Sequence, residues 1–136
     1  MLNKFASHIE QWRHNRRFLS EIPFNYPDWI VTAAFYTALH AVDTLLTKNG
    51  LTVNGHNGRN DILMRTHHYQ QIWRNYKQLY DTSRTVRYLA TPQKWVPAKD
   101  IMREVVQGLL YPIENSVKKL IDDPGLELPP INLRTE

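Results

Sequence analysis

The stretch from Trp29 to Lys48 constrains the fold more than any other part of this sequence. Its apolar residues fall on nearly every side of a helix, and Asn49 and Gly50 then provide a stop signal. A helix that is apolar all round has to be covered by other elements. We therefore predict that this helix, with Asp28 as its N-cap, is the central and most buried element of the protein.

Apolar residues recur at three-to-four-residue spacing through most of the remaining sequence, which is the period of an amphipathic helix. The expected helices besides the central one cover residues 2–19, 60–66, 69–89 and 98–121. Gly108 and Pro112 predict a kink near Leu109 in the last of these, because proline removes a backbone donor and clashes one turn back. No segment alternates as a strand does, so the predicted fold class is all-α, a four-to-five-helix up-down bundle.

The chain has 136 residues, which is the size of one domain with one hydrophobic core. We expect a single helical domain over residues 1–123, followed by an extended and mobile C-terminal tail over residues 124–136. Connections are predicted at residues 22–27, 52–58 and 91–97. Four Trp and seven Tyr exceed what one small core comfortably buries, so we also expect a homodimer with an aromatic interface.

Several classes of chemistry are excluded by what the sequence lacks. The absence of cysteine excludes disulfides, thiolate zinc sites, iron–sulfur clusters and cysteine nucleophiles. There is no glycine-rich phosphate loop and no nucleophile elbow of a serine hydrolase. His56, His67 and His68 lack the helical spacing of paired metal ligands, so neither a metal nor another cofactor is expected. His40, on the central helix, is interpreted as a structural histidine.

The sequence predicts a cytoplasmic protein that makes no membrane contact. No uninterrupted apolar run approaches the roughly 18 residues of a membrane span. The first twenty residues are basic and amphipathic and do not resemble a signal peptide.

The net charge is +4, and the positive charge is concentrated in the middle of the sequence. Between Arg59 and Lys99 lie eight basic and two acidic residues, which give this segment a charge of +6. Trp and Tyr residues are interleaved with the basic ones, a combination that suits a polyanion with stackable bases. The alternative is a solvated helix face with core aromatics behind it.

Two regions contain candidate ligand-binding residues. His56, Asn57 and Arg59 lie where a loop enters a helix, and free backbone donors at such a junction favour an anion. The alternative is that Asn57 only caps the helix and His56 only orders the loop. On the expected 69–89 helix, Arg84 lies on a mainly basic face on which Asp81 is the only acidic residue. The members of this basic face are Lys77, Asp81, Arg84 and Tyr88, with Arg87 beside them.

Several segments together resemble the HEPN-domain family. The segment 34–46 resembles the second helix of HEPN domains, and Gly50 followed by His56-Asn-Gly-Arg59 is similar to the loop feature that comes after it. Tyr76-x-x-Leu79 and the segment 83–88 resemble elements of the fourth helix, and the long last helix fits as well. The resemblance covers about residues 29–121, nearly the whole expected domain.

This resemblance implies a helical bundle that dimerises, binds RNA or a nucleotide, and acts beside a nucleotidyltransferase-type antitoxin. Many HEPN proteins are metal-independent ribonucleases that use an Arg, a polar residue after it and a His four to six residues further on. The nearest candidate here is Arg59-Asn60 with His67, but seven residues intervene, one more than the pattern allows. The resemblance therefore implies an irregular nuclease motif, which a dimer would complete by bringing His56 or His67 of both subunits to one cleft.

The sequence thus predicts a HEPN-like RNA-binding protein, with metal-independent endoribonuclease activity of a toxin–antitoxin or defence system as its enzymatic form. The alternative is a catalytically inactive HEPN-like module that binds a nucleotide or an acidic partner protein. Proton transfer is assigned to His56 or His67 and phosphate clamping to Arg59. The expected ligand-binding residues are Asn57, Asn60, Arg84, Arg87 and Tyr88.

Overall fold

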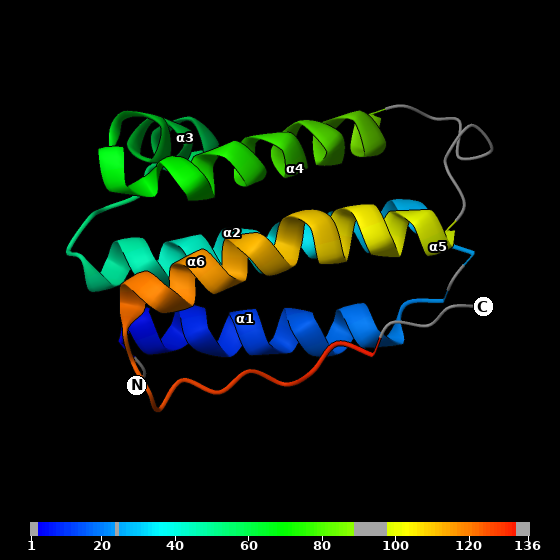
Figure 1. Cartoon of the computed structure of the whole chain (residues 1–136), viewed down its shortest axis with the longest axis horizontal. Coiled ribbons are helices and arrows are strands. Elements are labelled where there is room, and N and C mark those ends of the chain that lie inside the picture. Colours follow the sequence, from blue (N-terminus) through cyan, green and yellow to red (C-terminus); the bar gives the residue numbers. More distant parts are fainter. Residues whose placement is uncertain (1–2, 24, 89–97, 133–136) are drawn as a thin grey trace.

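The computed structural model describes residues 3–23, 25–88 and 98–132, and all regular structure within these ranges is helical (Figure 1). In chain order the elements are α1 (Lys4–Glu21), α2 (Pro27–Lys48), α3 (Gly55–Arg65), the 3-10 turn η1 (His67–Tyr69), α4 (Gln70–Tyr88), α5 (Ala98–Ile101), the π-helical segment η3 (Met102–Leu110) and α6 (Tyr111–Ile121). The predicted all-α bundle is confirmed for this part of the chain. The expected loop at 91–97 lies outside the described residues.

Successive long helices run in opposite directions, with α1, α2 and α4 followed by one rod made of α5, η3 and α6 (Figure 1). Helix α2 packs against α1, α4, η3 and α6, and α3 lies against α4. Helix α2 is long and apolar enough to cross a membrane by length and composition, but 78% of that stretch is buried inside the bundle. The prediction that α2 is the central and most buried helix is therefore confirmed.

Helix α2 begins two residues earlier than the sequence suggested. Tyr26 occupies the N-cap position and Pro27 the first helical position, so Asp28 lies in the first turn and is not the cap. Proline suits this place because its fixed φ is helical and its missing N–H would have no partner there. The helix ends as predicted, and Gly50 follows with a φ of 75°, a left-handed conformation that favours glycine.

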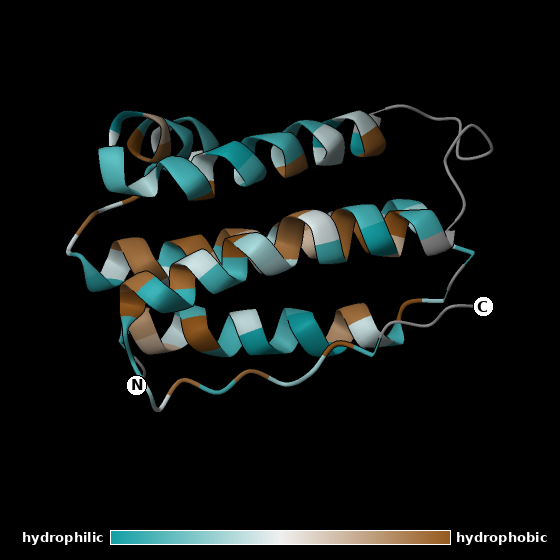
Figure 2. Cartoon of the chain, in the orientation of Figure 1, coloured by the Kyte–Doolittle hydropathy of each residue, from teal (hydrophilic) through white to brown (hydrophobic). Residues whose placement is uncertain are grey.

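Trp29 was expected in the core, but its side chain is 56% exposed. It lies in the first turn of α2, next to Ile30 and Val31, which are buried. Figure 2 shows hydrophobic stretches on α2 and on the last helix, whereas the side of α4 in view is largely hydrophilic. The apolar pattern thus identifies α2 as the core helix but does not show which apolar residues of its first turn stay exposed.

Helix α3 starts at Gly55, five residues before the expected start at Asn60. The connection from α2 is therefore short, and His56 and Asn57 lie inside the first turn of the helix. The two glycines at positions 55 and 58 led the sequence pattern to favour a loop here. Gly55 has a φ of 71°, so it provides the turn into the helix.

The last helix contains the irregularity that Gly108 and Pro112 predicted near Leu109. It takes the form of the π-helical segment Met102–Leu110, after which α6 continues the same rod (Figure 1). Proline lies within the first two positions of α6, and because η3 runs directly into α6, the backbone N–H that it lacks leaves out one hydrogen bond of the rod. A wider turn before proline is one way to avoid its clash with the preceding carbonyl.

A buried ion pair joins the first helix to the last. Arg16 donates through Nη1 to Glu114 Oε1, and Trp12 Nε1 donates to Glu114 Oε2 at 2.7 Å. Both charged side chains are nearly inaccessible to solvent. A buried carboxylate is tolerated when both oxygens are paired, so these three residues fix how α1 and α6 meet.

The described part of the segment after α6, residues 122–132, is extended, as predicted, but it is held along α1, whereas a mobile tail was expected. Arg13 Nε donates to the carbonyl of Glu127 at 2.9 Å, and Arg16 Nε donates to that of Pro129 at 2.7 Å. Two apolar side chains of the segment are buried in the core, Leu126 and Ile131. The prolines and glycine that suggested mobility only prevent a helix here.

The central place of α2 leads to a stability prediction. Leu45→Ala removes a fully buried side chain from the middle of the core, and it should lower the free energy of unfolding by roughly 2–5 kcal/mol. Leu120→Ala is the matched control, because Leu120 on α6 is 39% exposed. Urea denaturation measures both changes. Equal losses for the two variants would show that α2 is not the centre of the core.

Candidate functional site

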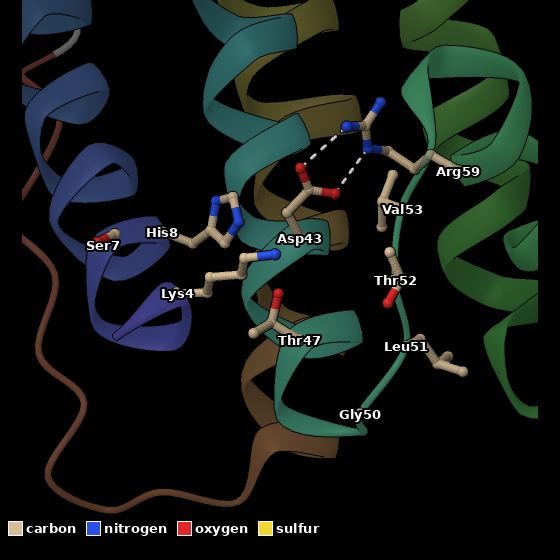
Figure 3. A pocket seen from close by; sticks show the side chains of 10 residues that line it. All are labelled: Lys4, Ser7, His8, Asp43, Thr47, Gly50, Leu51, Thr52, Val53 and Arg59. Carbon is tan, nitrogen blue, oxygen red and sulfur yellow. Dashed lines mark hydrogen bonds and ion pairs between the residues drawn. The ribbon is translucent and has the colours of Figure 1, made fainter. Parts of the chain in front are cut away.

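Arg59 and Asp43 form a buried ion pair between α3 and α2. Nε of Arg59 donates to Oδ1 of Asp43 at 2.7 Å, and Nη2 donates to Oδ2 at 2.9 Å (Figure 3). Both side chains are less than a tenth exposed. Burial lowers the pKa of Arg59, but the hydrogen bonds and charge interactions with Asp43 and Tyr76 together outweigh this effect and raise the pKa overall. The bidentate geometry therefore fixes a permanent charge at the start of α3.

His56 lies one helical turn before Arg59 on α3 and is held by both polar and ring contacts. Its Nδ1 is 3.4 Å from Nη1 of Arg59. The imidazole packs against the rings of Phe35 and Tyr80, with centroid distances of 5.9 and 5.6 Å. The side chain is only half-buried, so one edge of the imidazole remains open to solvent.

Two arginines of α4 lie over aromatic rings beside His56. The guanidinium of Arg84 is 5.7 Å from the centroid of Tyr80, and that of Arg87 is 5.4 Å from the centroid of Phe35. Arg87 also donates through Nη1 to the Tyr36 hydroxyl at 2.8 Å. Stacking on a ring holds a guanidinium in place, and the exposed Arg84 can present its donors to an anion.

The charges around His56 change its titration. Burial lowers the pKa of the imidazole from its ordinary value of 6.5, and the positive charge of Arg59 lowers it further. Arg87 and, to a smaller extent, Arg84 act in the same direction, whereas Asp43 opposes them. His56 is therefore mainly neutral at pH 7, which is the form that accepts a proton.

The structure brings four of the eight predicted site residues together, and we refer to this group as the His56 cluster. Its members are His56, Arg59, Arg84 and Arg87, with Phe35, Tyr36 and Tyr80 as its aromatic side chains. The cluster joins α2, α3 and α4. The side chain of Tyr88, the fifth residue expected on this face, lies outside the described part of the chain.

No described contact joins three of the predicted residues to the cluster. His67 is exposed on η1, and the hydrogen bonds described for Arg59 go to Asp43 and His56. Asn57 is exposed on the first turn of α3, and Asn60 is half-buried with its Oδ1 atom enclosed. In the described residues, no hydrogen bond therefore connects His67 to the Arg59-Asn60 motif.

The phosphate-clamping role expected for Arg59 needs correction. Its two strongest donors are used by Asp43, and the residue is 7% exposed. Arg59 acts instead as a fixed charge that holds α3 on α2 and faces Nδ1 of His56. Sequence reasoning missed Asp43 as its partner, although a lone acid on an otherwise apolar helix is a signal that a cation must meet it.

The aromatic side chains of the cluster were also missed as site residues. Phe35 and Tyr36 belong to the segment that resembles HEPN domains, and Tyr80 was interpreted as core. Their interleaving with basic residues was visible in the sequence. Only the fold shows that rings from α2 and α4 share one surface with His56.

Comparison with known proteins adds no relative to this description. No family model, curated protein or solved structure matches the chain significantly.

The charges around His56 predict the direction in which its pKa is shifted, and this shift can be measured. An NMR titration of the imidazole should give a His56 pKa below 6.5, and Arg87→Gln should raise it, because removing a nearby positive charge favours the imidazolium. Lys77→Gln is the control, since Lys77 is exposed and paired with Asp81. An unchanged His56 pKa in Arg87→Gln would mean that the guanidinium does not act on the ring.

Proposed function

We propose that this protein is a HEPN-like RNA-binding protein and that the His56 cluster is its RNA-binding surface. The observation that carries the proposal is that Arg84 and Arg87 lie over the two rings, Tyr80 and Phe35, that also pack against the half-buried, neutral imidazole of His56. Phosphates and stackable bases are the two features of RNA that such a surface matches.

Each member of the cluster has a separate role in this proposal. Arg84 is exposed and pairs with an RNA phosphate, whereas Arg87, held by the Tyr36 hydroxyl, provides a second charge at a fixed position. The rings of Tyr80 and Tyr36, which are half-buried, offer edges and faces for a base. Arg59, held by Asp43, adds a fixed positive charge next to His56.

We further propose that the surface cleaves the RNA it binds, without a metal ion. His56 accepts the proton of a 2′-hydroxyl, whose oxygen attacks the adjacent phosphorus as the bond to the 5′-oxygen breaks. Arg84 and Arg87 stabilise the charge that develops on the phosphorane. The products are a 2′,3′-cyclic phosphate and a 5′-hydroxyl, whose proton comes from water or from a second subunit's histidine.

One observation favours the second candidate function, a catalytically inactive module that binds a nucleotide or an acidic partner protein. In the described part of the chain the cluster contains a single histidine, because His67 lies on η1 and is exposed. Acid–base cleavage works best with two titrating groups. The experiment below separates the two candidates.

RNA binding tests the proposal directly. Arg84→Gln should weaken binding of a labelled single-stranded RNA and reduce the slope of log affinity against log salt by about 1. Arg74→Gln is the matched control, because Arg74 is an exposed arginine on the same helix, about 15 Å away along its axis. Equal effects of the two substitutions would place RNA binding elsewhere.

Cleavage is measured on the same RNA in the presence of EDTA. The wild-type chain should produce 2′,3′-cyclic phosphate ends, and His56→Ala should abolish them while still binding RNA. Cleavage that persists in His56→Ala contradicts the proposed base. RNA that binds and stays intact with the wild-type chain identifies the inactive module instead.

We also propose that the protein is a homodimer that acts in the cytoplasm, with a nucleotidyltransferase-type antitoxin as its partner. An exposed aromatic surface at one end of the bundle supports the dimer. Phe18, Tyr26 and Trp29 are each about half exposed and line one open cavity of about 490 Å³ together with Glu21, Ile22 and Pro23. Exposed aromatic groups of this kind occur at protein interfaces.

Light scattering tests the dimer. The wild-type chain should have a mass of twice 16.1 kDa, and the double variant Phe18→Ser/Trp29→Ser should move toward 16.1 kDa. Met64→Ser is the control, because Met64 is a similarly exposed apolar residue on α3. A wild-type mass of 16.1 kDa at micromolar concentration would refute the dimer.

A further inference from the structure

His8, His40 and Asp43 bring three metal-binding side chains together on the side of α2 that faces α1. His8 comes from α1, and the other two lie one turn apart on α2. One ligand atom from each lies within 4.8 Å of the other two. No other group of three such residues is found in the described part of the chain. The sequence separation of 32 residues between the histidines explains why spacing rules did not reveal it.

The spacing of the two imidazoles matches a metal site. Nδ1 of His8 lies 3.3 Å from Nδ1 of His40. Two nitrogens that bind one zinc ion at 2.0–2.1 Å with tetrahedral angles are about 3.3–3.4 Å apart. The alternative explanation of this distance is a hydrogen bond in which one neutral imidazole donates its N–H group to the other. Such a bond uses the N–H group of only one of the two rings.

Asp43 is positioned as a third ligand by the ion pair already described. Arg59 uses one lone pair on each carboxylate oxygen, which leaves a second lone pair on each. Ligating carboxylates are commonly oriented by such outer hydrogen bonds. The charges of Arg59 and Asp43 cancel, so a divalent cation would meet a neutral ligand set, as it does with three histidines.

A cavity beside these residues leaves room for the remaining ligands. It has a volume of about 400 Å³ and is lined by His8 and Asp43, with polar side chains from the end of α2 and the following loop. Figure 3 shows the His8 ring directed across the gap between α1 and α2 toward Asp43, with Thr47 nearby. Lys4 also reaches into this cavity, and its charge limits the affinity for a cation.

We propose that His8, His40 and Asp43 form a zinc-binding site with one open coordination position toward this cavity. Two histidines, one carboxylate and an exchangeable ligand are a set that zinc accepts in proteins. The ion would join α1 to α2 at the end of the bundle where the cavity opens. Asp43 links this site to the His56 cluster through Arg59, but the two histidine ligands are not members of that cluster and the proposed reaction on RNA does not use the ion.

Isothermal titration of zinc chloride into the full chain tests the site, with protein made without a polyhistidine tag and stripped with EDTA. We expect one zinc ion per chain, and roughly tenfold or greater loss of affinity in His8→Ala and in His40→Ala. The matched controls keep wild-type affinity: His14→Ala on the exposed side of α1, and His67→Ala/His68→Ala on η1.

Two further measurements keep the result interpretable. Circular dichroism shows whether His40→Ala remains helical, and His40→Gln replaces it if the smaller side chain disturbs α2. Cobalt(II) absorption should show the intense visible bands of a tetrahedral site in the wild type and lose them in His8→Ala. Absence of zinc binding, or loss of affinity only in the control variants, would overturn the proposal and leave the imidazole pair as a hydrogen bond.

Discussion

The ion pair between Arg59 and Asp43 is the interaction on which the organisation of this protein depends. Removing a charge from water inside a helical bundle is costly unless a partner is fixed in the same place. The bidentate contact meets this requirement and thereby locks the first turns of α3 against the middle of α2. His56 lies on the same turn of α3 as Arg59, so the ion pair also fixes the position of His56 beside the arginines of α4.

Asp43 therefore faces two surfaces of different character. On one side its partner Arg59 contributes to the positive potential around a neutral imidazole. On the other side the same carboxylate lines the cavity between α1 and α2, next to a pair of histidines. A single buried acid on the most apolar helix thus connects both chemically distinctive regions of the bundle, and neither region needs a strand, a cysteine or a glycine-rich loop.

Helices were predictable from the sequence because their signals are local, whereas contacts between helices were not. Apolar spacing located α2 and α4 within a few residues, and the disturbance near Leu109 followed from a single proline. Basic and aromatic interleaving indicated the right part of the chain for the His56 cluster. Which cation pairs with Asp43 depends on how α3 is rotated, and apolar periodicity in a short glycine-containing helix does not determine that rotation.

The contacts between the two ends of the chain have a consequence for how it is made. Arg13 and Glu127 are 114 residues apart, and Arg16 is separated from Glu114 by 98. The first helix therefore leaves the ribosome long before its ionic partners exist, with Trp12 and Arg16 still solvated. Closing loops of this length is among the slowest steps available to a helical domain. Completion of the bundle must therefore wait until the segment through Pro129 has been synthesised, so synthesis itself sets when the first helix acquires its partners.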